Sequence, residues 1–453
     1  MGILFCTNLF NQYIGWNQKV ITHNVRHRKN VSKEQYRLAF AISMGGMLEF
    51  YDFMVYAMMA SYIAENFFPS ADAVTSLLET FATFAVGYLS RPLGGLFFGH
   101  LGDKYGRKNT FTLTISIMAL TTALIGCLPT YDSVGVLAPV LLVTLRLFQG
   151  FSLGGELPGA MTYVSESSPG HSGLILGILF MSFQLGLSLG TFFHGLLSVF
   201  LSSEMMSLWG WRVPFWVGGL IGGLSYYIRR RFHESGLFLA LDLVKQHQTT
   251  PLSTLLRNHR NGFFCGFGIT AVLGSSATVL SIYMPGYLSD LYGFGREEVA
   301  WHTSLAFVMS APLCVLMGRI SDHFSHKWLL FLSILLIITV SLPFYHYIAS
   351  GHAGLGKIMM VSGLLSAVIT GLLPPMLVRL FPTEIRYTGV AAVYNLGFTL
   401  FGGLAPLITI LLIKPFGVAN APAFYLTMVS VFALLVYCIP WPAYLVSEQP
   451  FKK

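Results

Sequence analysis

Acidic side chains occur inside a long apolar stretch of this sequence, where a charge needs a function or a partner. Glu49 and Asp52 stand three residues apart in the run L-E-F-Y-D-F. This spacing places both carboxylates on one face of a helix, with Tyr56 one turn further on. A charge at the centre of a lipid bilayer costs about 3 kcal/mol on insertion scales, so it usually faces a cavity or a counterion. The chemistry indicated is the binding and release of protons by carboxylates away from bulk water.

Basic and amide side chains interrupt two further apolar stretches. Arg91 lies in one of them, and Arg146 opens the run R-L-F-Q-G-F-S-L-G-G-E, which ends at Glu156. Within that run Gln149 lies on the same helix stripe as Arg146, and Glu156 lies further along it. These charges suit a proton relay beside a site for a polar substrate. The alternative is a static ion pair, such as Asp52 with Arg146, that only holds two helices together.

Each of these residues has an expected role. Proton coupling is expected of Asp52 and Glu156 as the leading proton carriers, with Arg146 tuning both, and of Glu49. Contact with substrate is expected of Arg91, Gln149, Tyr56 and Gln184. Arg91 has two interpretations, because its forked guanidinium can bind a carboxylate or satisfy the backbone carbonyl that the following Pro92 leaves without a donor.

A short loop occurs twice in the chain. The first copy reads G-H-L-G-D-K-Y-G-R-K from Gly99 onward, and the second reads G-R-I-S-D-H-F-S-H-K, 219 residues later. Asp103 and Asp322 hold the same place in the two copies, and Glu166 and Glu384 keep this offset to within one residue. An internal repeat of about 200 residues is typical of secondary transporters, whose two halves rock around a shared central site.

The composition indicates a membrane protein. Only 10% of the residues are charged and the mean hydropathy is +0.65, whereas soluble domains carry about 25% charged residues. Twelve segments are long and apolar enough to span a membrane: 38–62, 77–100, 110–128, 135–163, 172–200, 212–229, 263–288, 299–319, 328–348, 355–379, 387–413 and 421–446. We predict an all-α membrane protein with twelve transmembrane helices in two pseudo-symmetric six-helix bundles. The expected domains are a cytoplasmic tail (1–36), two bundles (37–229 and 263–446), a cytoplasmic linker (230–262) and a second tail (447–453).

Lysine and arginine set the predicted orientation. If the N-terminus is cytoplasmic, the cytoplasmic loops hold most of the basic residues, among them Lys104, Arg107, Lys108, Arg229, Arg230, Arg231, Arg257, Arg260, Lys327 and Arg386. The opposite loops hold only Arg212, Arg296, Lys357 and Lys414. This asymmetry places both termini in the cytoplasm. Arg379, next to the inner face, is expected to extend its side chain to the interface.

Other classes of protein fit the sequence less well. A membrane enzyme would need polar reactive groups clustered near one membrane face, and a membrane sensor without transport, the alternative from another class, would usually carry a soluble output domain. The five cysteines form no C-x-x-C motif, so neither a metal site nor a disulfide framework is expected. No cofactor and no nucleic acid is expected. The expected partners are a small-molecule substrate, protons and the lipid bilayer, with the chain acting as a monomer.

Several longer motifs carry a family resemblance. They are M-L-E-F-Y-D-F, S-R-P-L-G-G-L-F-F-G-H-L-G-D-K-Y-G-R-K, R-L-F-Q-G-F-S-L-G-G-E, W-G-W-R-V-P-F and F-P-T-E-I-R-Y-T. Through them, residues 36 to 446 resemble the major facilitator superfamily, in particular the metabolite–proton symporter branch with its proline/glycine-betaine, shikimate and 2-oxoglutarate transporters. The resemblance implies a proton-coupled symporter that works by alternating access in a bacterial inner membrane.

The resemblance also implies a cytoplasmic gate at the first loop motif. Asp103 should cap or pair with the end of a neighbouring helix, and Arg107 should support it. The expected gate residues are Gly99, Asp103, Gly106, Arg107, Asp322, Glu166, Glu384 and Arg386. In the second copy Ser325 and His326 replace the glycine and the arginine, which predicts a weaker second gate.

The choice of substrate follows from the arginines. Dicarboxylate carriers of the branch are expected to place a second arginine in the fifth span, but this fifth span holds Gln184 and has neither arginine nor lysine. One arginine, Arg91, with the acids Asp52 and Glu156 favours a zwitterion such as proline, betaine or ectoine. A small organic acid of the shikimate, 2-oxoglutarate or citrate type is the alternative.

Overall fold

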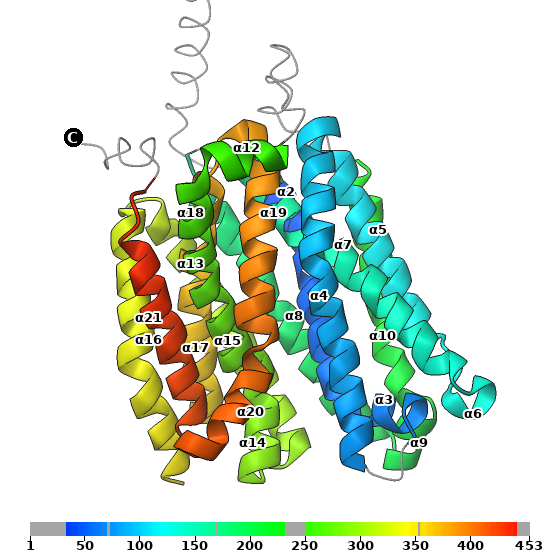
Figure 1. Cartoon of the computed structure of the whole chain (residues 1–453). Helices are drawn as coiled ribbons and strands as arrows, with labels where there is room; N and C mark the ends of the chain where they lie inside the picture. The colour runs from blue at the N-terminus through cyan, green and yellow to red at the C-terminus, as the bar shows by residue number, and fades with distance from the viewer. Residues whose placement is uncertain (1–32, 70–72, 169, 232–250, 352–353, 442–453) are drawn as a thin grey trace, which may run out of the picture.

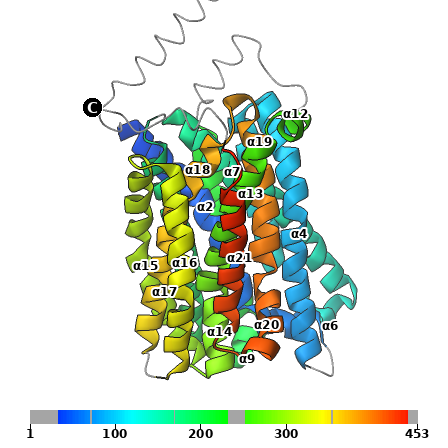
Figure 2. The same cartoon turned by 60° about the vertical axis from the view of Figure 1, so that its left-hand side comes forward.

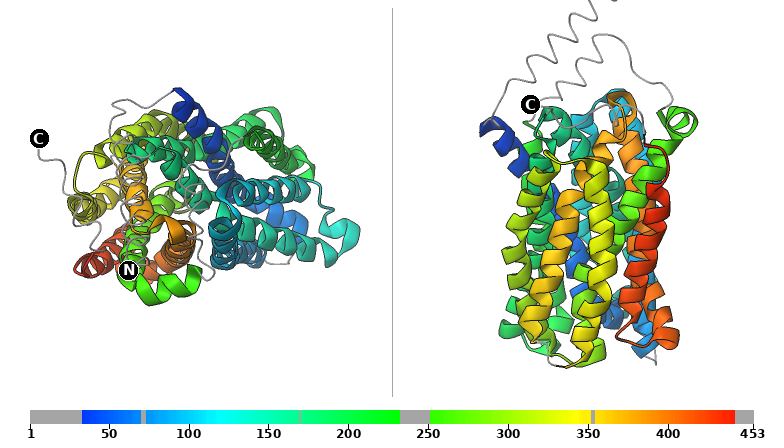
Figure 3. Two further views of the ribbon diagram at one scale, coloured as in Figure 1. Left: turned by 90° about the horizontal axis from the view of Figure 1, so that it is seen from above. Right: turned by 90° about the vertical axis from the view of Figure 1, so that its left-hand side faces the viewer.

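The structure is a computed structural model that describes residues 33–69, 73–168, 170–231, 251–351 and 354–441. These residues form helices joined by short connections, and no strand occurs among them. The helices run side by side in two groups, with α4, α5, α7 and α10 on one side of Figure 1 and α13, α16, α17 and α21 on the other. Seen along the helix axes, the two groups lie next to each other (Figure 3).

The first group comes from the first half of the chain. Its helices are α2 (Lys33–Met58), α3 (Ala60–Phe67), α4 (Ala73–Tyr105), α5 (Arg107–Gly126), α6 (Tyr131–Val134), α7 (Leu137–Ser167), α8 (Ser172–Phe200), α9 (Ser203–Leu208), the 3-10 turn η1 (Gly210–Arg212) and α10 (Val213–Arg229). Six of the predicted spans correspond to α2 with α3, and to α4, α5, α7, α8 and α10.

The second group comes from the second half of the chain and again contains six predicted spans. It contains α12 (Pro251–Asn258), α13 (Arg260–Ala277), η2 (Thr278–Ile282), α14 (Tyr283–Tyr292), α15 (Arg296–Ser321), α16 (His326–Ala349), α17 (Leu355–Leu372), α18 (Pro374–Arg379), η3 (Thr383–Ile385), α19 (Arg386–Gly397), η4 (Phe398–Gly403), α20 (Ala405–Phe416) and α21 (Ala421–Tyr437). Figure 2 shows α13, α16, α17 and α21 side by side. The short helix α12 lies in the predicted linker and was not expected from the sequence.

Length and hydropathy alone identify nine spanning helices among the described residues. Of the remaining predicted spans, α10 and α21 are each 17 residues long. The third, α4, is 33 residues long but carries Arg91, Asp103 and Lys104. Charged residues, of which Arg91 and Asp103 are buried, therefore lower the hydropathy of a helix in which we expect function.

Two predicted spans are not regular helices. The seventh contains the π-helical segment η2, and the eleventh contains η4, where Gly397, Gly402 and Gly403 flank or end the segment. Hydropathy did not identify these segments, because it does not report how the backbone hydrogen bonds shift. Segments of π-helix are rare and occur mostly at functional sites.

The two halves pack through glycines at two related crossings. A Cβ atom on Gly99 of α4 would lie 2.9 Å from Cα of Thr388 in α19, and one on Gly177 of α8 would lie 2.7 Å from the carbonyl oxygen of Cys314 in α15. Each crossing joins a helix of one half to a helix of the other. Small residues allow such close contacts between membrane helices. The two crossings are similar because the two halves of the chain repeat the same order of helices.

The predicted orientation can be tested by cysteine labelling. The helix α12 lies at one end of the molecule, and α6 lies at the other end (Figure 1). Asp132 of α6 and Arg257 of α12 are both exposed. In a background without native cysteines, Asp132→Cys should react with an impermeant maleimide from outside the cell, and Arg257→Cys only after the membrane is opened. Labelling of both from the same side would contradict the orientation.

Candidate functional site

Asp52 lies in a network of polar side chains from three helices of the first half. Its Oδ2 atom is 3.0 Å from Nη1 of Arg146, and its Oδ1 atom accepts a hydrogen bond from Thr122 at 3.3 Å. Arg146 donates to Oε1 of Gln149 at 2.7 Å, and the amide of Gln149 donates to Thr122 at 2.7 Å. The Arg146 guanidinium lies 3.6 Å from the centroid of the Tyr56 ring. The predicted pairing of Asp52 with Arg146 is therefore present, and Thr122 is a member that the sequence did not reveal.

Glu49 forms a second buried ion pair, with Arg91. Oε1 of Glu49 is 2.9 Å from Nη2 of Arg91, and both side chains are fully buried. Among the described residues, Nη1 of Arg91 and Oε2 of Glu49 have no hydrogen-bond partner. Buried polar atoms are nearly always hydrogen-bonded, so this pair keeps one donor and one acceptor that a bound molecule can use.

Aromatic rings surround the Arg91 guanidinium. Its Cζ atom lies 5.4 to 5.8 Å from the centroids of four rings, those of Phe53, Tyr88, Tyr394 and Phe398. The first two rings come from α2 and α4, and the other two come from α19 and η4 of the second half. Arg91 thus lies where the two halves meet, next to one of the two π-helical segments.

Asn395 of α19 ties this centre to the second half. It accepts a hydrogen bond from Nε of Arg91 at 3.3 Å, and its own amide donates to the carbonyl oxygen of Gly154 in α7 at 2.7 Å. A single side chain of the second half therefore contacts two helices of the first. Sequence reasoning missed Asn395; it is a polar residue inside the predicted eleventh span, and that was the available signal.

The backbone interpretation of Arg91 is wrong. A proline leaves the carbonyl four residues earlier without its helical donor, and for Pro92 this carbonyl belongs to Tyr88. The hydroxyl of Thr399 donates to that carbonyl oxygen at 3.0 Å, whereas the Arg91 guanidinium bonds to side chains. Arg91 is therefore available for a role in the site.

Glu156 has a different partner from the one expected. Its Oε1 atom is 2.7 Å from Nη2 of Arg229, and its Oε2 atom accepts a hydrogen bond from Thr114 at 2.7 Å. Arg146 pairs with Asp52 instead, so it does not tune Glu156 by direct contact. Arg229, which we assigned to a cytoplasmic loop, is fully buried. The reason is its place in the last turn of α10, from which its long side chain reaches back between the helices.

Gln184 forms no hydrogen bond with the residues of the two central ion pairs in the part of the chain that the structure describes. It belongs to α8, and its Nε2 atom donates to the carbonyl oxygen of Gly363 in α17 at 3.1 Å. This bond crosses between the halves. None of the hydrogen bonds found for Gln184 reaches Arg91 or Arg146, so its expected contact with substrate stays a prediction.

The first loop motif closes one end of the molecule. The carboxylate of Asp103 accepts hydrogen bonds from the backbone N–H groups of Tyr387 at 3.3 Å and Thr388 at 2.8 Å, which belong to the first turn of α19. A carboxylate is favoured at a helix N-terminus. Arg107 lies 3.1 Å from Asp103 and 3.3 Å from Glu166. The predicted cap, with its supporting arginine, is present.

The other expected gate residues lie around this cap. Arg386 pairs with Glu166 at 3.2 Å, which adds a second arginine from the opposite half. Gly106 adopts a φ of 112° between α4 and α5, a conformation that favours glycine, and Gly99 lies at the α4–α19 crossing described above. Glu384 lies on η3 and forms no ion pair within the part of the chain that the structure describes.

The second loop motif makes a matching closure. The carboxylate of Asp322 accepts hydrogen bonds from the backbone N–H groups of Gly173 at 2.7 Å and Leu174 at 2.9 Å, in the first turn of α8. Arg379 lies 3.1 Å from this carboxylate. Each half therefore caps a helix of the other half, and the two caps lie at the same end of the molecule.

Arg379 bears on two expectations. Its guanidinium donates to Asp322 and to the hydroxyl of Ser172, at 3.1 and 3.0 Å, so it has partners within the protein, and the extension of its side chain to the membrane interface stays a prediction. Arg379 also contacts Nε2 of His326 at 3.0 Å. The second gate was expected to be weaker because Ser325 and His326 replace the glycine and the arginine of the first copy. Arg379, which is distant in sequence, supplies a guanidinium to Asp322 instead, and the relative strength of the two gates stays a prediction.

The two halves cap each other at one end, and buried ion pairs lie within the first half; two such halves around a central polar site are typical of secondary transporters. The sequence profile of the Major Facilitator Superfamily matches residues 42–406 and 266–452, and the chain belongs to this superfamily. The predicted fold class, twelve helices in two six-helix bundles, is thereby confirmed. The protein is a multi-pass integral membrane protein, and in bacteria such transporters lie in the inner (cytoplasmic) membrane.

Several known proteins are similar to this chain. A putative proline/betaine transporter of Staphylococcus haemolyticus is 35% identical over 421 residues, with coverage of 89% of this chain and 87% of the relative. The proline/betaine transporter of Salmonella typhimurium is 32% identical over 412 residues, with coverage of 87% and 81%. The glycine betaine/proline/ectoine/pipecolic acid transporter OusA of Dickeya dadantii is 32% identical over 422 residues, with coverage of 87% and 81%. These relatives are named as transporters, so the chain belongs to a class of transporters and not to the alternative classes of membrane enzyme or sensor.

Among solved structures, the proton:xylose symporter XylE is similar in fold. It superposes with a TM-score of 0.75 at 15% sequence identity, covering 90% of this chain and 96% of that one. The human organic anion transporter MFSD10 superposes with a TM-score of 0.63 at 14% identity, covering 90% and 100%. At such low identity these likenesses support the fold and nothing more.

We expect substitutions in the first cap to slow the transport cycle more than they weaken substrate binding. Asp103→Asn and Arg107→Ala remove charge-assisted hydrogen bonds worth about 2 kcal/mol. These bonds join the two halves at this end, so we expect them to break when the end opens. Turnover in proteoliposomes should fall about tenfold, with little change in the dissociation constant of the substrate. Lys104→Gln, at an exposed neighbour, is the control. A large rise in the dissociation constant at normal turnover would contradict a gating role.

Proposed function

We propose that the protein is a proton-coupled symporter of a small zwitterion such as proline or betaine, which works by alternating access as a monomer. The observation that carries this proposal is the pair of buried carboxylate–arginine contacts, Glu49–Arg91 and Asp52–Arg146, whose side chains are at most 4% exposed. In this proposal the carboxylates of the two pairs bind protons and Arg91 binds the substrate, side by side in one half of the molecule.

The charge of the centre favours a zwitterion. Two carboxylates and two guanidiniums cancel, so the site has no surplus charge to balance a dianion. An uncompensated charge in such a buried place is costly. The unpaired Nη1 of Arg91 and the unpaired Oε2 of Glu49 can receive a carboxylate and an ammonium group. A zwitterion supplies both and adds no net charge.

The aromatic rings support a cationic group of low hydration. Ring faces attract ammonium groups, and this attraction is the usual means of recognising quaternary ammonium ions. The four rings around Arg91 already surround one cation at 5.4 to 5.8 Å. The same surroundings suit the quaternary nitrogen of betaine or the ring ammonium of proline. The names of the relatives, proline/betaine transporters among them, agree with this choice.

Proton binding supplies the coupling. When Asp52 takes up a proton it loses its attraction for Arg146, which then keeps only Gln149 and the Tyr56 ring as contacts. The neighbouring carboxylate of Glu49 can respond to this change in charge, so that Arg91 becomes free to bind the substrate. Glu156, paired with Arg229, is the second proposed proton carrier. Along α7 it lies between Arg146 of the centre and Glu166 of the first cap.

Uptake into proteoliposomes tests the proposed function. With an imposed inward pH gradient, labelled proline or betaine should accumulate, and accumulation should vanish when the gradient is collapsed. The organic-acid alternative is tested in the same panel with shikimate, 2-oxoglutarate and citrate. Uptake of one of these acids without uptake of a zwitterion would replace the proposed substrate class, and a lack of dependence on the pH gradient would overturn proton coupling.

Arg91→Lys should impair transport strongly although it keeps the charge. Lysine has no fork with which to hold Glu49, Asn395 and a carboxylate together, so we expect uptake to fall by tenfold or more. A protection assay on Arg91→Cys checks whether substrate lies there, since bound substrate should slow thiol labelling. Unchanged labelling in a variant that still binds substrate would remove Arg91 from the binding site.

A further inference from the structure

Two long helices of the first half contain a proline in their interior. Pro92 lies inside α4, and Pro158 lies inside α7. A proline has no N–H group, so the carbonyl four residues earlier loses its helical hydrogen bond. In α4 this carbonyl belongs to Tyr88, and in α7 it belongs to Gly154. Within a membrane, where water does not replace the lost donor, such a carbonyl needs a partner from a neighbouring helix.

The second half supplies both missing donors. The hydroxyl of Thr399, in η4, donates to the Tyr88 carbonyl oxygen at 3.0 Å. Nδ2 of Asn395, in α19, donates to the Gly154 carbonyl oxygen at 2.7 Å. Both donor side chains are buried. The hydrogen bonds that the prolines remove within the first half are therefore made between the halves. We refer to these two hydrogen bonds as the latch.

Glycines of the first half make room for the side chains of α19. A Cβ atom on Gly95 of α4 would lie 2.3 Å from Nδ2 of Asn395, so an alanine there would displace the amide. Nearby, the hydroxyl of Tyr387 donates to the carbonyl oxygen of Gly155 in α7 at 2.7 Å. A Cβ atom on Gly159 would lie 2.3 Å from that hydroxyl. Close packing of this kind determines which carbonyl each side chain of α19 reaches.

Asn395 also connects the latch to the charged centre. Its Oδ1 atom accepts a hydrogen bond from Nε of Arg91 at 3.3 Å, while its Nδ2 atom donates to the carbonyl oxygens of Gly154 and Ala391. A side-chain amide carries its acceptor and its donors on opposite sides, so the bond from Arg91 orients the amide nitrogen toward Gly154. Nη2 of the same guanidinium holds Glu49 at 2.9 Å. A movement of Arg91 therefore reaches α7 through one side chain.

We propose that the latch holds the cytoplasmic end closed, and that Asn395 is the positioning residue through which Arg91 acts on it. While this end is closed, α19 and η4 provide the donors for the two carbonyls. When these segments move away from α4 and α7, water can reach the carbonyls and replace the donors. Loss of a latch donor therefore destabilises the closed form more than the open form. This inference requires the alternating access of the proposed function, but neither its substrate nor its proton coupling.

Double electron–electron resonance on the full-length protein tests the latch without substrate. Spin labels on Asn109→Cys in α5 and Arg319→Cys in α15, both exposed near the capped end, report the separation of the halves in a background without native cysteines. Thr399→Val keeps the shape of threonine without its hydroxyl, and Asn395→Leu removes the amide. Each should raise the ratio of open to closed molecules about fivefold, the usual effect of one lost hydrogen bond. Thr399→Ser keeps the hydroxyl and should restore the wild-type ratio.

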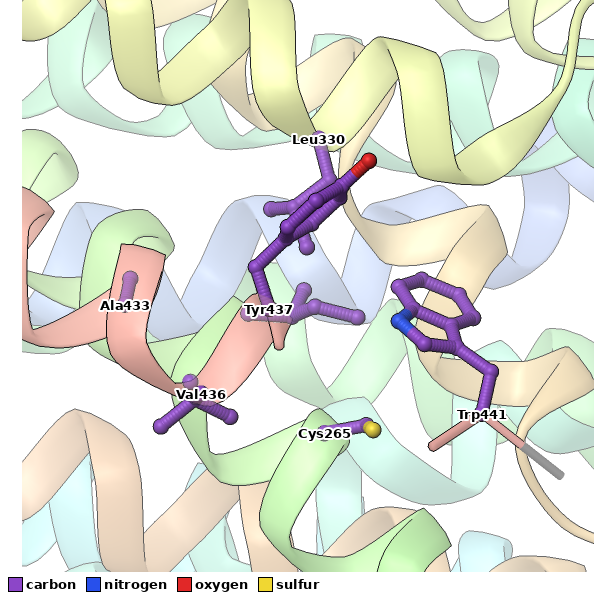
Figure 4. A pocket seen from close by; sticks show the side chains of 8 residues that line it. Cys265, Leu330, Ala433, Val436, Tyr437 and Trp441 are labelled. Atoms are coloured by element: carbon purple, nitrogen blue, oxygen red, sulfur yellow. The ribbon is translucent and has the colours of Figure 1, made fainter. Parts of the chain in front are cut away.

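Two controls change contacts that lie within the second half. The buried hydroxyl of Thr303 donates to the carbonyl oxygen of Val299 in its own helix at 2.6 Å, so Thr303→Val removes a similar bond that does not join the halves. Val436 lines a small pocket between α13, α16 and α21, together with Cys265, Leu330 and Trp441 (Figure 4). Val436→Ala therefore changes packing inside the second half. Both controls should keep the wild-type ratio.

Gly95→Ala approaches the latch from the first half. The added methyl group displaces the Asn395 amide, so this variant should raise the ratio as Asn395→Leu does, and it keeps the test decisive if Asn395→Leu does not fold. An unchanged ratio in folded Thr399→Val would overturn the latch. The same conclusion would follow from equal ratios in Thr399→Val and Thr399→Ser, or from an equal rise in Thr303→Val.

A double-mutant cycle tests the link between Arg91 and Asn395. Lysine keeps a charge beside Glu49 but lacks the Nε atom that donates to Asn395, so Arg91→Lys should raise the ratio about threefold. In the Asn395→Leu background the same substitution should have little further effect, because the bond is already absent. Fully additive effects would remove Asn395 as the positioning residue. No substrate and no pH gradient are used, so a failure here is distinct from a failure of the proposed symport.

Discussion

Asp52→Asn should abolish the accumulation of substrate against its gradient while exchange of substrate across the membrane continues. Asparagine keeps the size of the side chain and can still bond to Thr122, but it cannot take up or release a proton. With one proton per substrate, a gradient of one pH unit supports about tenfold accumulation, and in the variant the ratio should fall to about one. Counterflow of labelled substrate should stay within a few-fold of the wild-type rate.

The measurement compares pH-driven uptake with counterflow in the same proteoliposomes. Asp132→Asn is the control, since Asp132 is exposed on α6 and should accumulate substrate like the wild type. Gradient-driven accumulation in Asp52→Asn would remove this residue from proton coupling. It would then favour the static interpretation, in which the Asp52–Arg146 pair only holds α2 against α7.

Arg229→Met should strongly destabilise the protein. The substitution leaves the Glu156 carboxylate fully buried with only the Thr114 hydroxyl as a partner. Removal of one member of a buried ion pair typically costs about 3 to 5 kcal/mol, whereas replacement of both members by neutral groups is often tolerated. The double variant Glu156→Gln with Arg229→Met should therefore recover much of the lost stability.

Thermal unfolding in detergent and the yield of monodisperse protein measure this effect. Arg230→Met serves as the control, because Arg230 follows in the chain but is exposed. A double variant as unstable as Arg229→Met would show that the pair itself is not what matters. Glu156→Gln alone separates stability from coupling: if it accumulates substrate normally, Glu156 is a structural residue and Asp52 carries the proton.

The sequence predicted the helices and the caps well because both depend on local signals. Apolar length located the spans, and the repeated loop placed Asp103 and Asp322 at equivalent positions before their partners were known. The Asp52–Arg146 pair was also within reach, since both charges interrupt apolar runs and each needs a counterion.

The partners that depend on distant packing could not be predicted. Arg229 at the end of a span counts as a cytoplasmic basic residue whether its side chain points to water or to Glu156. The sequence alone therefore does not tell which of these two orientations the side chain takes. Asn395 and Thr399 contact Arg91 and the Tyr88 carbonyl from about 300 residues away. Asn395 stands out as a polar residue inside a predicted span, but nothing local identifies the partners of these two residues. Arg379, from another helix, pairs with Asp322 where the second motif lacks its arginine. A missing motif residue therefore does not imply a missing interaction.

The distribution of buried charge gives the duplicated halves different freedom to diverge. In the described residues, the three ion pairs buried within the spans, Glu49–Arg91, Asp52–Arg146 and Glu156–Arg229, all belong to the first half. The second half contributes neutral groups to the centre, such as Asn395, Tyr394 and Phe398. Substitutions in α19 and η4 can therefore reshape the space offered to a solute without changing any titrating group. During evolution, the first half can keep the groups proposed for proton coupling while substitutions in the second half change which substrate is accepted.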